Sequence, residues 1–299
     1  MDVLTIKDLH KCFGDKKVLC GLDMSVPEHS IFGFVGRNGS GKTTTMKAVL
    51  GLLKTDKGEI YVADEKVSFG QNSTNKYIGY LPDVPEFYSF LTAKEYLLFC
   101  GEMHGLQRKH VISRADELLQ LVGLDKERHR IKGYSRGMKQ RLGIAGALLC
   151  SPKLLICDEP TSALDPIGRK EILDILSAAK NETTILFSTH ILSDVERICT
   201  DVAFLNDGKI AMQRKMSELG ALKAVHEFCV ETCRPEDTEV FLRKFDKVRK
   251  ETECKLIFMG DEARMHEILF FIASNHIPVQ KIEHVEPSLE ALFLEVSAK

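Results

Sequence analysis

A glycine-rich segment carries the clearest chemical signal in this chain. Residues 36–43 read Gly-Arg-Asn-Gly-Ser-Gly-Lys-Thr and satisfy the pattern G-x-x-x-x-G-K-[ST]. Such a loop wraps an anion with its backbone N–H groups, and the helix that follows adds its positive end. We therefore expect the Lys42 ammonium to reach the β- and γ-phosphates of a nucleotide and the Thr43 hydroxyl to bind Mg²⁺. The expected phosphate-binding residues are Gly36, Arg37, Asn38, Gly39, Ser40, Gly41, Lys42, Thr43 and Thr44.

Two adjacent acids form a second candidate group. Residues 154–157 are Leu-Leu-Ile-Cys, and Asp158 and Glu159 follow directly. Two carboxylates at the end of a buried strand can take different roles in hydrolysis. We expect Asp158 to hold Mg²⁺ and Glu159 to act as general base on the attacking water. Acids at such a turn also commonly cap the next helix. The catalytic interpretation therefore depends on the presence of the phosphate loop in the same chain.

Strands and helices alternate over roughly the first 215 residues, as positioning these groups requires. The apolar segments 31–36, 153–160 and 183–190 predict strands buried inside a parallel sheet. A helix is expected over residues 42–53. The first eleven residues alternate apolar and polar types, which predicts a strand and not a secretion signal.

Two further regions have a different character. Between Tyr80 and Lys132 the pattern becomes mostly helical, and Thr92 and Glu95 form a capping box. After about residue 220 the segments alternate between strand and helix and end in a short helix, which predicts a small second α/β unit. The expected segments are strand 226–232, helix 237–248, strand 254–260, helix 262–274 and strand 278–285. We place the domains at residues 1–217, with a helical subdomain at about 84–135, and at 221–299.

Composition narrows the class of protein. The 299 residues are 44% hydrophobic and carry a formal net charge of -2, so no basic excess favours nucleic acid as a partner. No segment approaches 18 consecutive apolar residues. Nine cysteines without paired spacing are typical of reduced thiols in a cytosol. A partial metal site could be formed by His226, Cys229 and Cys233. The favoured interpretation is that these cysteines are small buried hydrophobic residues.

The class of phosphate-loop protein follows from a third segment. Residues 134–141 read Tyr-Ser-Arg-Gly-Met-Lys-Gln-Arg and lie upstream of the acidic strand. Here the chain resembles the ATP-binding-cassette (ABC) family, whose signature, usually LSGGQ-QR, holds this place. Residues 162–165, Ser-Ala-Leu-Asp, are similar to the family's dimer-contact loop, and His190 is similar to its switch histidine. The resemblance covers roughly residues 1–215, and five ordered motifs make it specific.

The resemblance implies a role for each matching residue. Ser135 and the N–H group of Gly137 would bind the γ-phosphate of ATP held by an opposite subunit, with Asp165 at the dimer contact. His190 would contact the γ-phosphate and orient the water, although a satisfied core histidine is the common alternative at a strand end. Phe13 would stack on adenine, against the alternative of an ordinary core phenylalanine.

Some positions depart from the family pattern. Asp83 stands where the family usually has Gln, or Glu in some branches, and ionised Asp only accepts hydrogen bonds. We expect it to approach Mg²⁺ or its water. Arg136 and Met138 replace Gly and Gln of the common signature. Similar signatures, and an ending similar to residues 286–290 (Glu-Pro-Ser-Leu-Glu), belong to exporters of the ABC-2 type.

The resemblance implies a fold and a function. The fold is an α/β phosphate-loop cassette with a mostly parallel core sheet and an N-terminal antiparallel β subdomain. An inserted helical subdomain and a small C-terminal α/β unit complete it. The expected function is MgATP hydrolysis as one half of a homo- or heterodimer of ABC ATPase subunits. This dimer would drive the separately encoded transmembrane permease of an exporter from the cytoplasmic face of the cell membrane. A soluble ABC ATPase without a membrane partner is the alternative. A GTPase or small-molecule kinase is disfavoured because no N-K-x-D motif is present.

Overall fold

The computed structural model describes residues 1–71, 73–222, 227–285 and 289. The chain divides into two compact units, Met1–Met216 and Ser217–Lys299. Within the described ranges, no helix is both long and apolar enough to cross a membrane.

A six-stranded sheet forms the centre of the first unit, in the order β10-β9-β3-β8-β7-β6. Its first five strands along the chain are parallel, and only β10 runs antiparallel to its neighbour. Strands β3, β7 and β8 are buried along their whole length, as their unbroken apolar sequences predict. The strands are β3 (Ile31–Gly36), β6 (Ile78–Leu81), β7 (Leu154–Asp158), β8 (Thr184–Thr189), β9 (Asp201–Asn206) and β10 (Lys209–Lys215).

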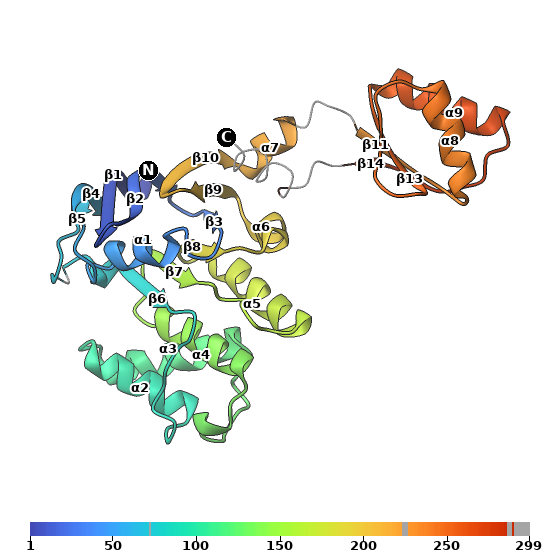
Figure 1. Cartoon of the computed structure of the whole chain (residues 1–299). Coiled ribbons are helices and arrows are strands. Elements are labelled where there is room, and N and C mark those ends of the chain that lie inside the picture. Colours follow the sequence, from blue (N-terminus) through green and yellow to red (C-terminus); the bar gives the residue numbers. More distant parts are fainter. Residues whose placement is uncertain (72, 223–226, 286–288, 290–299) are drawn as a thin grey trace. The chain divides into compact units, whose positions relative to one another are not determined.

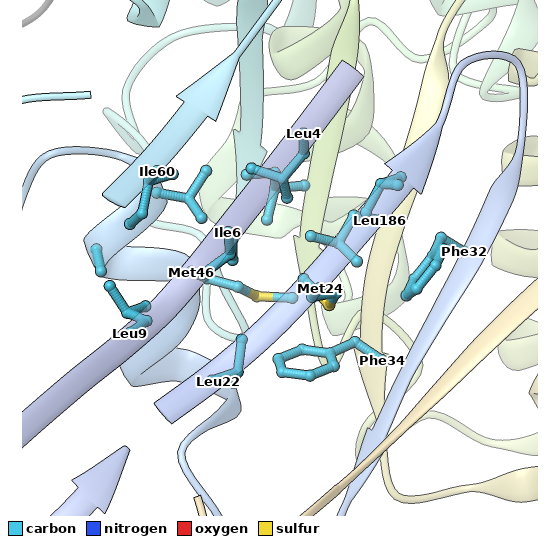
Figure 2. Packing of buried hydrophobic residues seen from close by; sticks show 14 of the residues in the cluster. Leu4, Ile6, Leu9, Leu22, Met24, Phe32, Phe34, Met46, Ile60 and Leu186 are labelled. Carbon is cyan, nitrogen blue, oxygen red and sulfur yellow. The ribbon is translucent and has the colours of Figure 1, made fainter. Parts of the chain in front are cut away.

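An antiparallel sheet packs against the central one. Its strand order is β2-β1-β4-β5, and the strands are β1 (Asp2–Phe13), β2 (Lys16–Pro27), β4 (Lys57–Val62) and β5 (Glu65–Lys66). Figure 2 shows the buried layer between the two sheets and α1 (Lys42–Val49), where side chains of β1 and β2 meet those of β3 and α1. The residues labelled there are Leu4, Ile6, Leu9, Leu22, Met24, Phe32, Phe34, Met46, Ile60 and Leu186. This core fixes the strand and the helix that flank the phosphate loop.

Most helices of the first unit lie between or after the strands of the parallel sheet. Helices α2, α3 and α4 occur between β6 and β7 and form a group of their own (Figure 1). Thr92 caps α2, and its predicted capping box with Glu95 is present. The helix expected over 42–53 ends earlier, at Val49, because Gly51 takes a left-handed conformation with φ 68°. The helices are α2 (Ala93–Met103), α3 (Arg108–Leu121), α4 (Arg136–Leu148), α5 (Pro166–Ala179) and α6 (Leu192–Ile198). The next helix, α7 (Met216–Leu222), begins at the boundary between the two units.

The second unit contains a four-stranded antiparallel sheet in the order β12-β13-β11-β14. Its chain order, β-α-β-β-α-β, is that of the split β-α-β fold. Aromatic side chains dominate its core: Phe228, Phe241, Phe245, Phe258 and Phe271. The elements are β11 (Glu227–Thr232), α8 (Pro235–Lys244), β12 (Val248–Lys250), β13 (Lys255–Met259), α9 (Glu262–Ser274) and β14 (Val279–Val285).

The α/β fold class predicted from the sequence is confirmed. The prediction for one helix of the second unit is wrong in its end point. The expected helix 237–248 ends at Lys244. Lys247 has φ 52°, which no helix continues through, and Val248 pairs with Phe258 in β12. Of the predicted terminal helix, which starts at Pro287, the structure describes Leu289 alone, and His226 lies outside the described residues. Cys229 is buried and Cys233 is exposed.

Candidate nucleotide site

The loop between β3 and α1 has the geometry of an anion cradle. Gly41, just before the helix, has φ 114°, a conformation that L side chains rarely adopt. Lys42 folds back over the loop, and its Nζ donates to the carbonyl oxygens of Gly36 (2.7 Å) and Arg37 (3.3 Å). Ser40 Oγ is buried and has no hydrogen-bond partner within the part of the chain that is described. A buried polar group without a partner is costly, so the loop offers an unused donor and acceptor to a phosphate.

Hard oxygen ligands lie beside this loop. Thr43 Oγ1 donates to Asp158 Oδ2 at 2.7 Å, across 115 residues of sequence. The other carboxylate oxygen, Asp158 Oδ1, accepts from Ser188 Oγ at 2.6 Å. Asp158 ends β7 and Ser188 lies opposite it on the parallel neighbour β8. Hydroxyl and carboxylate oxygens are the donors that Mg²⁺ prefers.

Glu159 stands between two cationic or potentially cationic groups. Its Oε1 lies 3.1 Å from Lys42 Nζ, and its Oε2 lies 2.8 Å from His190 Nδ1. The residue has φ 48°, and its N–H donates to Ser188 Oγ at 2.9 Å. Only 14% of its side chain is exposed. The parallel pairing of β7 and β8 brings together the residues that follow the ends of these two strands, Glu159 and His190.

Asp83 follows β6 and contacts a different set of residues. Its Oδ1 accepts from Ser162 Oγ at 2.7 Å and lies 3.5 Å from Arg136 Nη2. Its backbone carbonyl accepts from Gln140 Nε2 at 2.6 Å. These contacts join Asp83 to α4 and to the loop after Glu159.

The remaining predicted residues lie at element ends. Phe13 ends β1, is 50% exposed, and has Lys11 Nζ 5.2 Å from its ring centroid. Ser135 caps α4, where its Oγ accepts from Met138 N–H at 3.2 Å. Asp165 caps α5 by accepting from Gly168 N–H at 3.1 Å. Both residues therefore cap helices, and both are exposed in this chain.

Sequence reasoning did not single out Ser188. It touches both Asp158 and Glu159, so it fixes the two acids relative to β8. The only signal was a polar residue near the end of an apolar strand, and that is a common feature of strand ends. The contacts of Ser162 and Arg136 with Asp83, which join segments distant in sequence, were also not predicted.

A phosphate loop follows the buried strand β3, a histidine follows the adjoining strand β8, and two acids stand at the end of the next strand, β7. These groups together define a phosphate-loop ATPase of the cassette type. The family model for ABC transporters matches residues 19–162. The uncharacterised ABC transporter ATP-binding protein YxlF of Bacillus subtilis (strain 168) is 42% identical over 218 residues, covering 73% of this chain and 72% of that protein. The bacitracin transport ATP-binding protein BcrA of Bacillus licheniformis is 35% identical over 304 residues, covering 98% and 97%.

A solved structure shows the same fold. CbiO1 from Clostridium perfringens, part of the ABC transporter complex cbiONQ, matches with a TM-score of 0.68 and 26% identity, covering 81% of this chain and 95% of that one. This chain belongs to the ABC transporter family. It is a nucleotide-binding, ATP-hydrolysing subunit of a transporter.

Proposed function

We propose that this chain hydrolyses MgATP as one half of a dimer and powers the separately encoded transmembrane permease of an exporter. The proposal of ATP hydrolysis rests on one observation. The Glu159 carboxylate lies within hydrogen-bonding distance of both the Lys42 ammonium and the His190 imidazole, where the chain leaves β3, β7 and β8. A phosphate-binding cation, a carboxylate and an imidazole are groups that phosphoryl transfer to water can use.

Glu159 is the proposed general base. Its carboxylate would accept the proton of the water that attacks the γ-phosphate, while His190, hydrogen-bonded to it, would orient that water. Lys42 must leave Glu159 to bind phosphate, because its ammonium contacts the carboxylate in the described structure. Nucleotide binding would then free the base in the same step that places the phosphate beside it.

Thr43 and Asp158 are the proposed Mg²⁺ residues, and their oxygens, 2.7 Å apart, fit a hard cation. Bound there, Mg²⁺ would supply charge neutralisation of the β- and γ-phosphate oxygens. For Asp83, an approach to Mg²⁺ or its water is the alternative to a role in positioning Arg136, and the Mg²⁺ dependence of the rate in Asp83→Ala distinguishes the two. Phe13, with an exposed ring at the end of β1, would stack on the adenine base.

The dimer follows from an incomplete site. One phosphate loop leaves the γ-phosphate open on one side, and closed two-fold symmetry would let the α4 start of each subunit cover the nucleotide of the other. Ser135 Oγ and the Gly137 N–H group would be the covering donors, with Asp165 at the contact between subunits. Homodimer and heterodimer both satisfy this arrangement.

The permease and the direction of transport are supported by resemblance. BcrA is named for bacitracin transport, and the similarity to it extends over 98% of this chain. The ABC-2 type signature in residues 134–141 points to an exporter and so to a site at the cytoplasmic face of the membrane. The cassette would occupy residues 1–217, with its helical subdomain at about 84–135, and residues 221–299 would stabilise or regulate the dimer.

Reconstitution tests this proposal. The chain is purified with the membrane protein encoded beside it and placed in liposomes. We expect Mg²⁺-dependent ATP hydrolysis that Lys42→Ala abolishes. We also expect export of a substrate class that the membrane protein selects. Full ATPase activity with no stable association with a membrane protein would instead favour a soluble ABC ATPase.

A further inference from the structure

Two departures from the common ABC sequence pattern touch each other in this chain. Asp83 stands in place of the usual Gln, and Arg136 stands in place of a signature Gly. Asp83 Oδ1 lies 3.5 Å from Arg136 Nη2. The same Nη2 atom donates to Ser162 Oγ at 3.3 Å, and Ser162 Oγ donates to Asp83 Oδ1 at 2.7 Å. Three segments that are far apart in the sequence therefore meet in one polar triad.

The backbone beneath the triad is tightly held. Gly79 in β6 lies so close to α4 that a Cβ atom there would stand 2.2 Å from the carbonyl oxygen of Ala147. Gln140, with none of its surface exposed, donates to the carbonyl of Asp83 at 2.6 Å. Helix α4 and the end of β6 therefore hold the backbone at Asp83 in place, through close packing and a buried hydrogen bond to its carbonyl oxygen.

The triad also connects to the proposed base. The N–H group of Ser162 donates to the carbonyl oxygen of Glu159 at 3.0 Å, which closes the turn after β7. Arg136 is the first residue of α4, between Ser135 and Gly137. One end of the triad thus leads to Glu159 of the chain's own site, and the other leads to the segment proposed to act on the partner's ATP.

We propose that Asp83 is a positioning residue for the signature segment: together with Ser162 it fixes Arg136, and thereby the start of α4. This inference rests on the proposed dimer. Without Asp83, the Arg136 side chain, already 45% exposed, loses its anionic neighbour and the helix start loses a tether to the turn of Glu159. The nucleotide held by the chain's own phosphate loop keeps its contacts, whereas closure onto the partner's nucleotide suffers.

A double-mutant cycle on the full chain tests the proposal. Asp83→Ala, Arg136→Ala and the double variant are compared for kcat, for KM, and for ATP-driven dimerisation in a Glu159→Gln background. We expect each single variant to weaken dimerisation and lower kcat by about tenfold, and the double variant to fall no further, since one interaction is removed in all three. Nucleotide affinity of the isolated subunit stays within about twofold.

Two further variants make the test specific. Because Arg136 contacts Asp83 and Ser162 through a single atom, Nη2, Arg136→Lys should retain most of the rate. Asp116→Ala removes the ion pair with Lys94, which has similar exposure, and should leave the rate unchanged.

Three outcomes would overturn the proposal. In the first, the effects of Asp83→Ala and Arg136→Ala multiply in the double variant. In the second, Asp83→Ala raises the Mg²⁺ concentration needed for half-maximal rate while Arg136→Ala does not, which would give Asp83 a magnesium-side role. In the third, neither variant affects dimerisation. The proposed function itself fails differently, because Glu159→Gln with Asp83 intact would then remain monomeric with ATP.

Discussion

Lys42 Nζ lies 3.1 Å from Glu159 Oε1, so the expected phosphate-binding cation and the proposed general base are paired with each other. Lys42 is 6% exposed and Glu159 14% exposed, which makes this a shielded pair and not a surface contact. Removing one partner of such a pair leaves the other charge without compensation. An incoming phosphate replaces the carboxylate as the partner of Lys42, so nucleotide binding and release of the base are coupled.

Loss of the lysine should remove nucleotide affinity. Lys42→Ala deletes the charge-assisted hydrogen bonds to the β- and γ-phosphates, and we expect ATP affinity to fall by at least about tenfold. Titration with a fluorescent ATP analogue measures this. Lys47→Ala is the matched control, because Lys47 lies exposed on the same helix and should bind ATP normally. Unchanged affinity in Lys42→Ala would refute the phosphate-loop assignment.

Adenine stacking makes a second prediction. Phe13→Ala should weaken ATP binding by about tenfold, since aromatic stacking on a base contributes about 1–3 kcal/mol. Phe13→Tyr keeps the ring and should bind as the original chain does. Triphosphate without a base separates the two contributions: its affinity should not respond to either substitution. If Phe13→Ala binds ATP normally, Phe13 serves only the fold of the first hairpin.

Sequence patterns predicted what depends on contiguous residues. Strand β3 matches the apolar segment 31–36, and α9 matches the predicted helix 262–274, because each pattern is local and uninterrupted. The phosphate loop was predictable for the same reason. Strand β12 was missed because it has three residues and continues a helical pattern. The contacts of Ser188 with the acids were missed because they depend on the register of β7 against β8, which no short motif encodes.

Alkaline pH should weaken the fold through Tyr80. Burial, followed by the nearby charge of Asp158, raises the pKa of Tyr80 to about 12 from an ordinary value of 10.0. Between these two pH values the unfolded chain loses this proton more readily than the folded chain, so the free energy of unfolding falls as pH rises. The contribution is intact below pH 10 and is lost as pH passes about 12.

Tyr80→Phe isolates this contribution. Phenylalanine keeps the ring but has no ionisable hydroxyl, so its unfolding free energy should fall less steeply between pH 10 and about 12. Urea titrations of both proteins across that interval give the two slopes. Equal slopes would mean that Tyr80 ionises in the folded protein as it does in the unfolded chain.

The central claim is that ATP closes a dimer around a site in which Glu159 activates water. Glu159→Gln keeps the size of the side chain but removes the base, and we expect turnover to fall by about 10²–10⁴-fold with ATP binding retained. Light scattering of this variant with and without ATP is the most direct measurement. The account predicts a monomer without ATP and a dimer at saturating ATP. A variant that binds ATP and remains monomeric would contradict it.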